Sequence, residues 1–253
     1  MFFRFFALIF IFGFFSIWGG GKLPDLNPPL NPPYLNIPSP WADSLMDILT
    51  LEEKIGQLFM VAANGRNSEE TDYLVVDKLI EDYGIGGLIY FQSSPHRHVS
   101  LVNRFQSKSP LPLMNGIDGE WGLAMRIDSL DPYPWNMTLG AITNDSLLFK
   151  MGQALAGECQ AMGIHFNFAP VVDVNSNPLN PIINMRSYGE SVLEVSKKGL
   201  ALMNGMQDAG VLACAKHFPG HGDTESDSHK MLPLISHNRA SMDSLDLPPF
   251  KQL

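Results

Sequence analysis

Two hydrophobic patterns alternate along the chain from Trp41 onward. Short, continuously apolar segments are typical of strands buried on both faces, and segments with apolar residues three and four positions apart are typical of helices. The short segments predict five strands, over residues 56–63, 85–91, 111–117, 165–172 and 211–215. The longer segments predict helices over residues 68–83, 98–105, 146–162 and 192–209, with a further helix beginning near residue 244.

Local signals support these boundaries. Thr50 followed by Glu53 has the form of a capping box and predicts a helix start, and Gly84, Gly163 and Gly210 are placed to end helices. We expect the core-facing side of the 68–83 helix to carry Leu74, Val75, Leu79 and Ile80. On the 146–162 helix we expect it to carry Leu147, Met151, Ala154, Leu155 and Met162.

Strands that are each followed by a helix predict an α/β fold built from parallel βα units. A doubly wound sheet and a (β/α)₈ barrel share this pattern, and a barrel needs eight units, of which five are present here. The hydrophobic pattern therefore predicts the fold class and leaves both architectures open.

The N-terminal region differs from the rest of the chain. Arg4 precedes an uncharged apolar run, residues 5–18, which has the layout of a secretory signal, so we predict a signal peptide over residues 1–20. An uncleaved membrane anchor is the alternative. Residues 21–40 are rich in proline and predict a linker ahead of a domain over residues 41–253. We therefore expect export to the periplasm or cell envelope, with membrane contact only through the signal segment.

The composition of the chain limits the classes of binding partner that are expected. The 253 residues carry a formal net charge of −9 and are 45% hydrophobic, so a full core is available and a nucleic-acid partner is not expected. The two cysteines, Cys159 and Cys214, lie in apolar segments, and we expect two buried thiols rather than a disulfide.

Polar side chains follow several predicted strands. Asp118, Asp173 and the pair Lys216–His217 each come directly after an apolar strand segment. The carboxyl ends of parallel strands form the ligand-binding edge of α/β folds. One such aspartate could simply cap a helix, but together these residues predict a site.

Residues 216–234, KHFPGHGDTESDSHKMLPL, contain three of the seven histidines. His217 and His221 with Asp227 and His229 would suit a zinc site. Alternatively, Asp227 and His229 are two positions apart, so in extended backbone they face the same side and could form an acid/base pair. A solvated loop is the third interpretation, and the spacing alone leaves all three open.

The same segment resembles the signature of glycoside hydrolase family 3, in its β-N-acetylglucosaminidase branch. Further similar segments occur in the family's order: LTLEEKIGQLFMV (49–61), GIGGLIYF (84–91), DGEWGLAMR (118–126), FNFAPVVDVNSNP (166–178), RSYG (186–189) and LPPF (247–250). The resemblance implies a TIM-like barrel of which this chain supplies the first five βα units. It also implies a truncated chain, inactive by itself because the family's nucleophilic Asp would lie beyond residue 253.

The resemblance also implies roles for individual residues. Asp227 and His229 match a catalytic dyad in which the histidine is general acid and base. The residues that match substrate-binding positions are Asp118, Arg126, Arg186, Lys216 and His217. No metal or organic cofactor is implied, the partner is a carbohydrate, and the reaction is retaining hydrolysis of terminal β-linked N-acetylglucosamine from cell-wall fragments or other glycans. The alternatives are a non-catalytic sugar-binding fragment and another family 3 β-glycosidase, such as a β-glucosidase.

Two features set further expectations. Where many relatives carry D-x-E-G-G-R, this chain has Trp121 and lacks the arginine, which affects one side of the sugar site. Residues 220–228 contain no large apolar side chain, so we expect a moving loop that carries His229 over the bound sugar.

Overall fold

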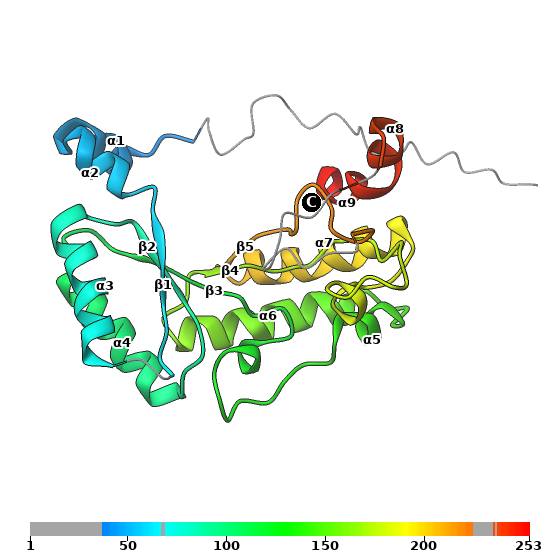
Figure 1. Ribbon diagram of the computed structural model, residues 1–253, viewed down its shortest axis with the longest axis horizontal. Coiled ribbons are helices and arrows are strands. Elements are labelled where there is room, and N and C mark those ends of the chain that lie inside the picture. Colours follow the sequence, from blue (N-terminus) through cyan, green and yellow to red (C-terminus); the bar gives the residue numbers. More distant parts are fainter. Residues whose placement is uncertain (1–36, 67–68, 225–234, 236) are drawn as a thin grey trace, which may run out of the picture.

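The computed structural model describes residues 37–66, 69–224, 235 and 237–253 (Figure 1). The predicted signal segment and nearly all of the linker lie outside these residues. The strands are β1 (Met60–Ala63), β2 (Gly87–Tyr90), β3 (Met114–Ile117), β4 (Phe166–Asn167) and β5 (Leu212–Ala213). The α-helices are α1 (Pro40–Ile48), α2 (Leu51–Gly56), α3 (Glu70–Tyr83), α4 (Pro95–Lys108), α5 (Asn136–Gly140), α6 (Ser146–Ala161), α7 (Val192–Asp208), α8 (Arg239–Ser241) and α9 (Pro248–Gln252). Short turns of other helix types are η2 (Leu123–Met125), η3 (Asn184–Arg186) and η4 (Met242–Asp246).

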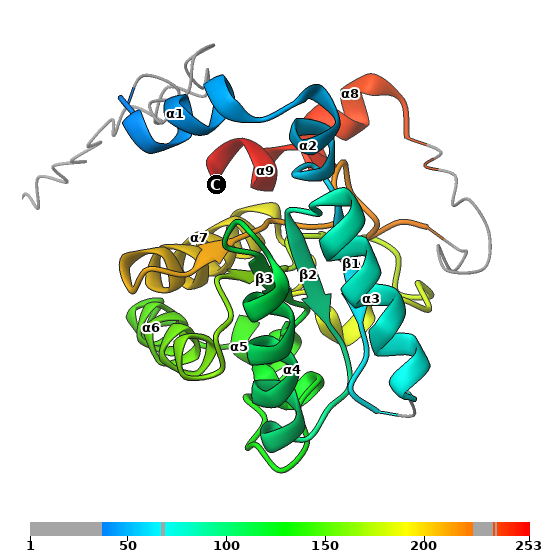
Figure 2. The same cartoon turned by 90° about the vertical axis from the view of Figure 1, so that its left-hand side faces the viewer.

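The five strands form one parallel sheet in the order β1-β2-β3-β4-β5. Figure 2 shows the first three of them, β1, β2 and β3, side by side. Each strand therefore pairs with the next one along the chain, and the order never reverses within the described residues. A doubly wound sheet reverses its strand order at a switch point, whereas a barrel wall does not. The strand order thus decides between the two architectures in favour of the barrel type.

The helices pack in neighbouring pairs along the sheet, and α6 and α7 lie side by side in Figure 1. Their backbones approach closely at two glycines. A Cβ on Gly152 would lie 2.5 Å from the carbonyl oxygen of Leu202, and one on Gly205 would lie 2.1 Å from that of Phe149. Side chains at these positions would force the two helices apart.

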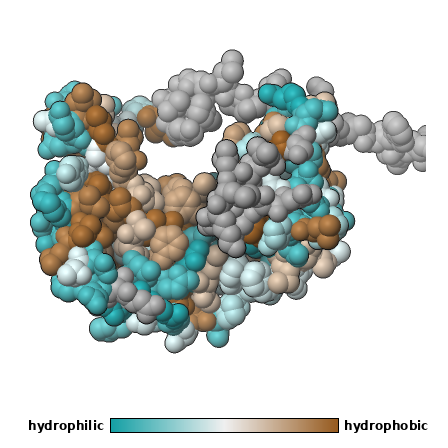
Figure 3. Space-filling model, in the orientation of Figure 1, coloured by the Kyte–Doolittle hydropathy of each residue, from teal (hydrophilic) through white to brown (hydrophobic). Residues whose placement is uncertain are grey.

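The buried face of α3 differs from the predicted one. Tyr73, Val76 and Ile80 are buried, whereas Leu74 and Val75 are 53% and 61% exposed, so that part of the prediction is wrong. Asp77 occupies a buried position on this face because Arg104 of α4 binds it, with Nη2 2.6 Å from Oδ2. Figure 3 shows a brown, hydrophobic surface on its left side, the side on which Figure 1 places α3.

The face of α6 is also shifted from the expected one. Met151 and Leu155 are buried as predicted, but Leu147 and Ala154 are exposed. Leu148 and Cys159 complete the buried stripe, at the three- and four-residue spacing of a helix. Cys159 is a free thiol whose pKa burial raises to about 12, and Cys214 is free but only partly buried.

The first predicted strand begins later than expected. The capping box at Thr50 and Glu53 is confirmed, but the helix continues through Gly56 and β1 starts only at Met60. A Cβ on Gly56 would lie 2.0 Å from the carbonyl oxygen of Tyr83. The glycine is therefore used where the end of α2 meets the end of α3, and not inside a strand.

The N-terminal end of the described chain begins almost directly with a helix. Pro40, the last residue of the predicted linker, is the first residue of α1, a position that suits proline. None of the helices within the described residues is long and apolar enough to cross a membrane.

Candidate functional site

A cavity of about 280 Å³ lies where β3, β4 and β5 end. Its walls are formed by Ile89, Asp118, Phe168, Ile182, Arg186, Lys216, His217 and His221. Four of the five predicted substrate-binding residues therefore line one cavity: Asp118, Arg186, Lys216 and His217. The fifth, Arg126, forms an ion pair with Asp118. This is the strand edge at which the sequence places a site.

Asp118 follows β3 directly and is held by two cations. Arg126 Nη2 lies 2.5 Å from Asp118 Oδ2, and Arg126 Nε donates to the main-chain oxygen of Asp118 at 3.1 Å. Lys216 Nζ binds the other carboxylate oxygen, Oδ1. The carboxylate is thus fixed from both sides and remains at the cavity wall.

Glu120 is a central residue of the site that the sequence analysis did not assign. Its side chain is 0% exposed, and it accepts hydrogen bonds from Arg186 Nε at 2.9 Å and Nη2 at 2.7 Å. Lys216 Nζ lies 2.7 Å from Glu120 Oε1. Burial opposes the charge, but the Arg186 hydrogen bonds and the Lys216 charge outweigh it and lower the pKa of Glu120 to about 2. The signal was its spacing of two residues from Asp118, which places both carboxyls on the same side of extended backbone.

Arg186 lies in η3 and is fixed along its whole length. Asn136 Nδ2 donates to the main-chain oxygen of Arg186 at 2.7 Å, and Arg186 Nη1 donates to that of Ile182 at 3.2 Å. Burial favours the neutral form, but the Glu120 hydrogen bond raises the pKa of Arg186, so the side chain stays charged. The guanidinium also contacts His217, with Nη2 3.1 Å from Nε2.

The loop after β3 is anchored around Glu120. Asn167 of β4 exchanges hydrogen bonds with the main chain of Gly119, at 3.0 Å to its nitrogen and 3.2 Å to its oxygen. Trp121 stacks on Trp135 with ring centroids 4.1 Å apart. Tyr133 continues this packing, since its nitrogen donates to the Trp121 oxygen at 3.0 Å. The tryptophan therefore stabilises the loop that presents Glu120.

His217 contacts a buried aspartate behind the cavity. His217 Nδ1 lies 2.6 Å from Asp173 Oδ2, and the Asp173 side chain is 0% exposed. The main-chain nitrogens of His217 and His221 also donate to this carboxylate, at 3.2 and 2.7 Å. Asp173 was predicted to lie at this strand edge, without an individual role.

The first part of the 220–228 loop is held more firmly than expected. Gly220, Gly222 and Thr224 are buried, and a Cβ on Gly222 would lie 1.7 Å from the carbonyl oxygen of Val174. Thr224 Oγ1 contacts His221 Nδ1. Residues 220–224 therefore have core contacts, made by tight backbone packing in place of large apolar side chains. The motion of the loop that carries His229 stays a prediction, because residues 225–234 lie outside the described part of the chain.

The predicted catalytic dyad, Asp227 and His229, lies outside the described residues. These two residues were also two of the four ligands of the alternative zinc site, together with His217 and His221. Within the described part of the chain, no three His, Cys, Asp or Glu side chains are grouped so as to hold a metal ion. His217 and His221 lie with their ring centroids 6.0 Å apart.

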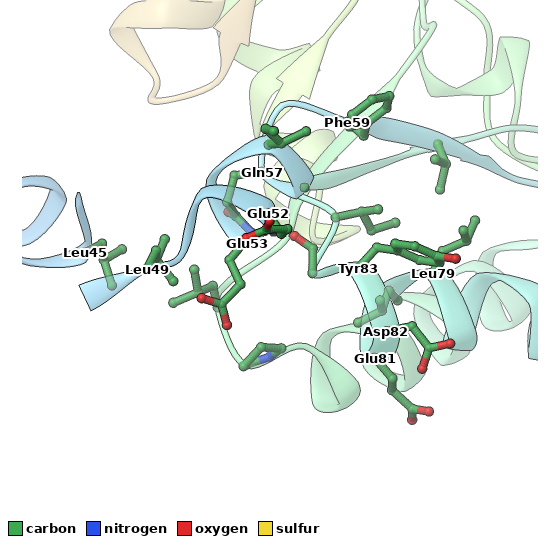
Figure 4. A pocket seen from close by; sticks show the side chains of 18 of the residues that line it. Leu45, Leu49, Glu52, Glu53, Gln57, Phe59, Leu79, Glu81, Asp82 and Tyr83 are labelled. Atoms are coloured by element: carbon green, nitrogen blue, oxygen red, sulfur yellow. Dashed lines mark hydrogen bonds between the residues drawn. The ribbon is translucent and has the colours of Figure 1, made fainter. Parts of the chain in front are cut away.

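A larger cavity, of about 680 Å³, lies at the opposite end of the strands (Figure 4). Its lining includes Leu45 of α1, Leu79 and Tyr83 of α3, and Phe59, which precedes β1. The lining is mostly apolar, and its acidic residues are Glu52, Glu53, Glu81 and Asp82. Residues at this end of a barrel contribute to stability rather than to chemistry, so the smaller, charged cavity is the candidate site.

Comparison with known proteins agrees with the fold indicated by the strand order. Residues 50–253 match the model of the glycosyl hydrolase family 3 N terminal domain. The chain belongs to glycoside hydrolase family 3.

Relatives within the family carry related names. The chain is 42% identical over 191 residues to "Beta-hexosaminidase A" of Pseudoalteromonas piscicida, covering 70% of this chain and 32% of that protein. The structure of a family 3 beta-N-acetylglucosaminidase from Paenibacillus sp. str. FPU-7 is 40% identical, with a TM-score of 0.73, covering 81% of this chain and 40% of that one. NagZ from Neisseria gonorrhoeae, in complex with N-trifluoroacetyl-D-glucosamine, is 28% identical, with a TM-score of 0.66, covering 76% and 59%.

The family 3 relatives confirm the fold prediction. Five parallel strands in chain order superpose on the TIM-like barrel domains of these structures, so the expected α/β, barrel-type architecture is correct. The chain spans between about a third and three fifths of the length of these relatives.

Proposed function

We propose that the protein containing this chain is a retaining exo-β-N-acetylglucosaminidase. The observation that carries the proposal is the cavity at the strand ends, where Asp118, Arg186, Lys216 and His217 meet. The names of the family 3 relatives support the same activity.

The cavity offers what a sugar ring requires. The Asp118 carboxylate can accept hydrogen bonds from hydroxyl groups, and the Lys216 ammonium can donate them. Ile89 and Phe168 supply apolar contact for the C–H faces of the ring. This mixture of fixed charges and apolar wall suits a neutral, polyhydroxylated ligand.

The reaction would proceed in two displacements, and an aspartate from outside these 253 residues would attack the anomeric carbon. His229 would first give its proton to the leaving oxygen and would then remove a proton from the attacking water. Asp227 would orient the imidazole and stabilise its protonated form. Residues 1–253 by themselves would therefore bind the sugar without hydrolysing it, and no metal or organic cofactor takes part in these steps.

The apolar N-terminal segment supports export to the periplasm or cell envelope. Cell-wall fragments or other glycans ending in β-linked N-acetylglucosamine would be the substrates there.

A substitution of Lys216 tests the substrate assignment. In the product of the complete reading frame, Lys216→Met should lower kcat/KM for a 4-nitrophenyl N-acetyl-β-glucosaminide roughly a hundredfold, because a hydrogen bond from a charged donor is lost. Lys108→Met is the matched control, since Lys108 pairs with Glu81 on the outer helices, and it should leave the rate unchanged. Faster hydrolysis of the corresponding β-glucoside by the wild-type protein would reassign the substrate, and sugar binding without turnover would reject the enzyme.

The acid/base assignment has a separate test. His229→Ala should slow substrates with poor leaving groups far more than aryl glycosides, because general acid catalysis contributes roughly 10²–10⁴-fold and a good leaving group needs little of it. Equal losses for both substrate types would refute the role of His229.

A further inference from the structure

Asp173 is a buried carboxylate that contacts the candidate site from behind. Its Oδ2 lies 2.6 Å from His217 Nδ1, and its Oδ1 accepts from the His221 main-chain nitrogen at 2.7 Å. The His217 main-chain nitrogen lies 3.2 Å from both oxygens. Among the described residues, these hydrogen bonds to the carboxylate all come from nitrogens of the segment that carries His217, so Asp173 holds that histidine in place.

Two independent contacts require the same proton position on His217. An ionised carboxylate only accepts hydrogen bonds, so the nitrogen that faces Asp173, Nδ1, must carry a proton. A guanidinium group only donates, so the nitrogen 3.1 Å from Arg186 Nη2, Nε2, must accept. Both contacts are satisfied together by the neutral tautomer with its proton on Nδ1, and by no other form of the ring.

We propose that Asp173 is a positioning residue that holds His217 as the Nδ1–H tautomer, so that Nε2 accepts from Arg186 and the imidazole and the guanidinium are both fixed where they face the bound sugar. His217 lines the cavity, whereas Asp173 lies behind it. The opposite tautomer would direct an N–H at the Arg186 guanidinium, donor against donor. The identity of the ligand rests on the proposed function, but the proton position does not.

An amide cannot replace this carboxylate. Asn at position 173 has one accepting oxygen and one donating nitrogen. If the nitrogen faces His217, the ring must release its Nδ1 proton; if it faces His221, it meets another N–H donor. Asp173→Asn therefore breaks at least one of the contacts that fix the imidazole.

The proton position is tested on the wild-type protein without ligand. Long-range ¹H–¹⁵N correlation spectra distinguish the two neutral tautomers and the cation of a histidine, and a His217→Gln sample identifies the His217 signals. We expect the Nδ1–H form at pH 7. The Nε2–H tautomer or the doubly protonated ring would overturn the proposal, without any variant having to fold.

A double-mutant cycle tests the positioning role, with N-acetylglucosamine binding followed by NMR titration. Asp173→Asn should weaken binding roughly tenfold to a hundredfold in the native background, as expected for a misplaced buried hydrogen bond. In a His217→Ala background it should change binding less than about twofold, because the residue through which it acts is gone. Asp77→Asn, which removes a buried carboxylate between α3 and α4, is the matched control and should leave binding unchanged.

The outcomes separate this inference from the proposed function. Equal losses in the two backgrounds would overturn the positioning role, because Asp173 would then act through the backbone alone. A wild-type protein that binds no N-acetylglucosamine would reject the proposed function, and with it the sugar-binding part of this inference, while the tautomer assignment would stand.

Discussion

Glu120 offers a direct measure of how strongly the charges of the site hold the domain together. Glutamine has nearly the shape of a protonated glutamic acid, so Glu120→Gln at neutral pH imitates protonation of this buried carboxyl. Lowering the pKa of Glu120 from its ordinary value of 4.5 to about 2 corresponds to about 3 kcal/mol of stability. Removing one partner of a buried ion pair costs a similar amount, about 3–5 kcal/mol. We therefore expect Glu120→Gln to reduce the free energy of unfolding by about 3 kcal/mol at pH 7.

The pH dependence of stability is a second measure of the free energy that the Glu120 carboxylate contributes. The unfolded chain binds a proton at Glu120 near pH 4.5, whereas the folded domain binds it only near pH 2. The stabilisation is therefore complete above pH 4.5 and is lost as the pH falls from 4.5 to 2. The difference between wild type and Glu120→Gln should shrink over this interval.

Urea denaturation followed by tryptophan fluorescence measures both effects. Glu81→Gln is the control, because Glu81 pairs with Lys108 at 2.7 Å but is half exposed, and such surface pairs contribute about 0.2–1 kcal/mol. A loss for Glu120→Gln no larger than that of the control, or a difference that stays constant down to pH 2, would refute the reasoning.

Two further predictions concern the packing of the helices. Burial lowers the pKa of His98, whose Nε2 contacts the Met162 main-chain oxygen, so the folded state disfavours protonation of this histidine. The free energy of unfolding should therefore fall as the pH drops below 6.5. His98→Gln should reduce this pH dependence, measured by urea denaturation between pH 7 and 5. An unchanged slope would contradict this role. Gly205→Ala should destabilise by about 1–3 kcal/mol because its Cβ meets the Phe149 carbonyl, whereas Gly157→Ala, with no atom within 4 Å, should stabilise by about 0.5–1 kcal/mol. Melting temperatures that shift in the same direction for both variants would contradict the close approach of α6 and α7.

Periodicity was sufficient to predict the α/β class and the order of strands and helices. Strands buried on both faces are continuously apolar, and the helices that cover them have apolar residues at every third or fourth position. Both patterns are local properties of the sequence. The place of Asp118 and Lys216 at the strand ends was predictable for the same reason. Their role in sugar binding was assigned by resemblance, since the same residues at the same spacing could also cap helices.

Which polar residues enter the interior was decided only by the tertiary structure. Asp77 and Glu120 look like surface residues in the sequence, but each is buried because arginines distant in the chain, Arg104 and Arg186, neutralise it. A pattern of apolar and polar positions carries no information about such partners, which lie 27 and 66 residues away. The same holds for Gly56, whose role as a contact point between α2 and α3 exists only once the two helices have met. The sequence therefore determined the elements and the edge at which the site lies, whereas long-range pairing of buried charges determined how the side chains of that site are held.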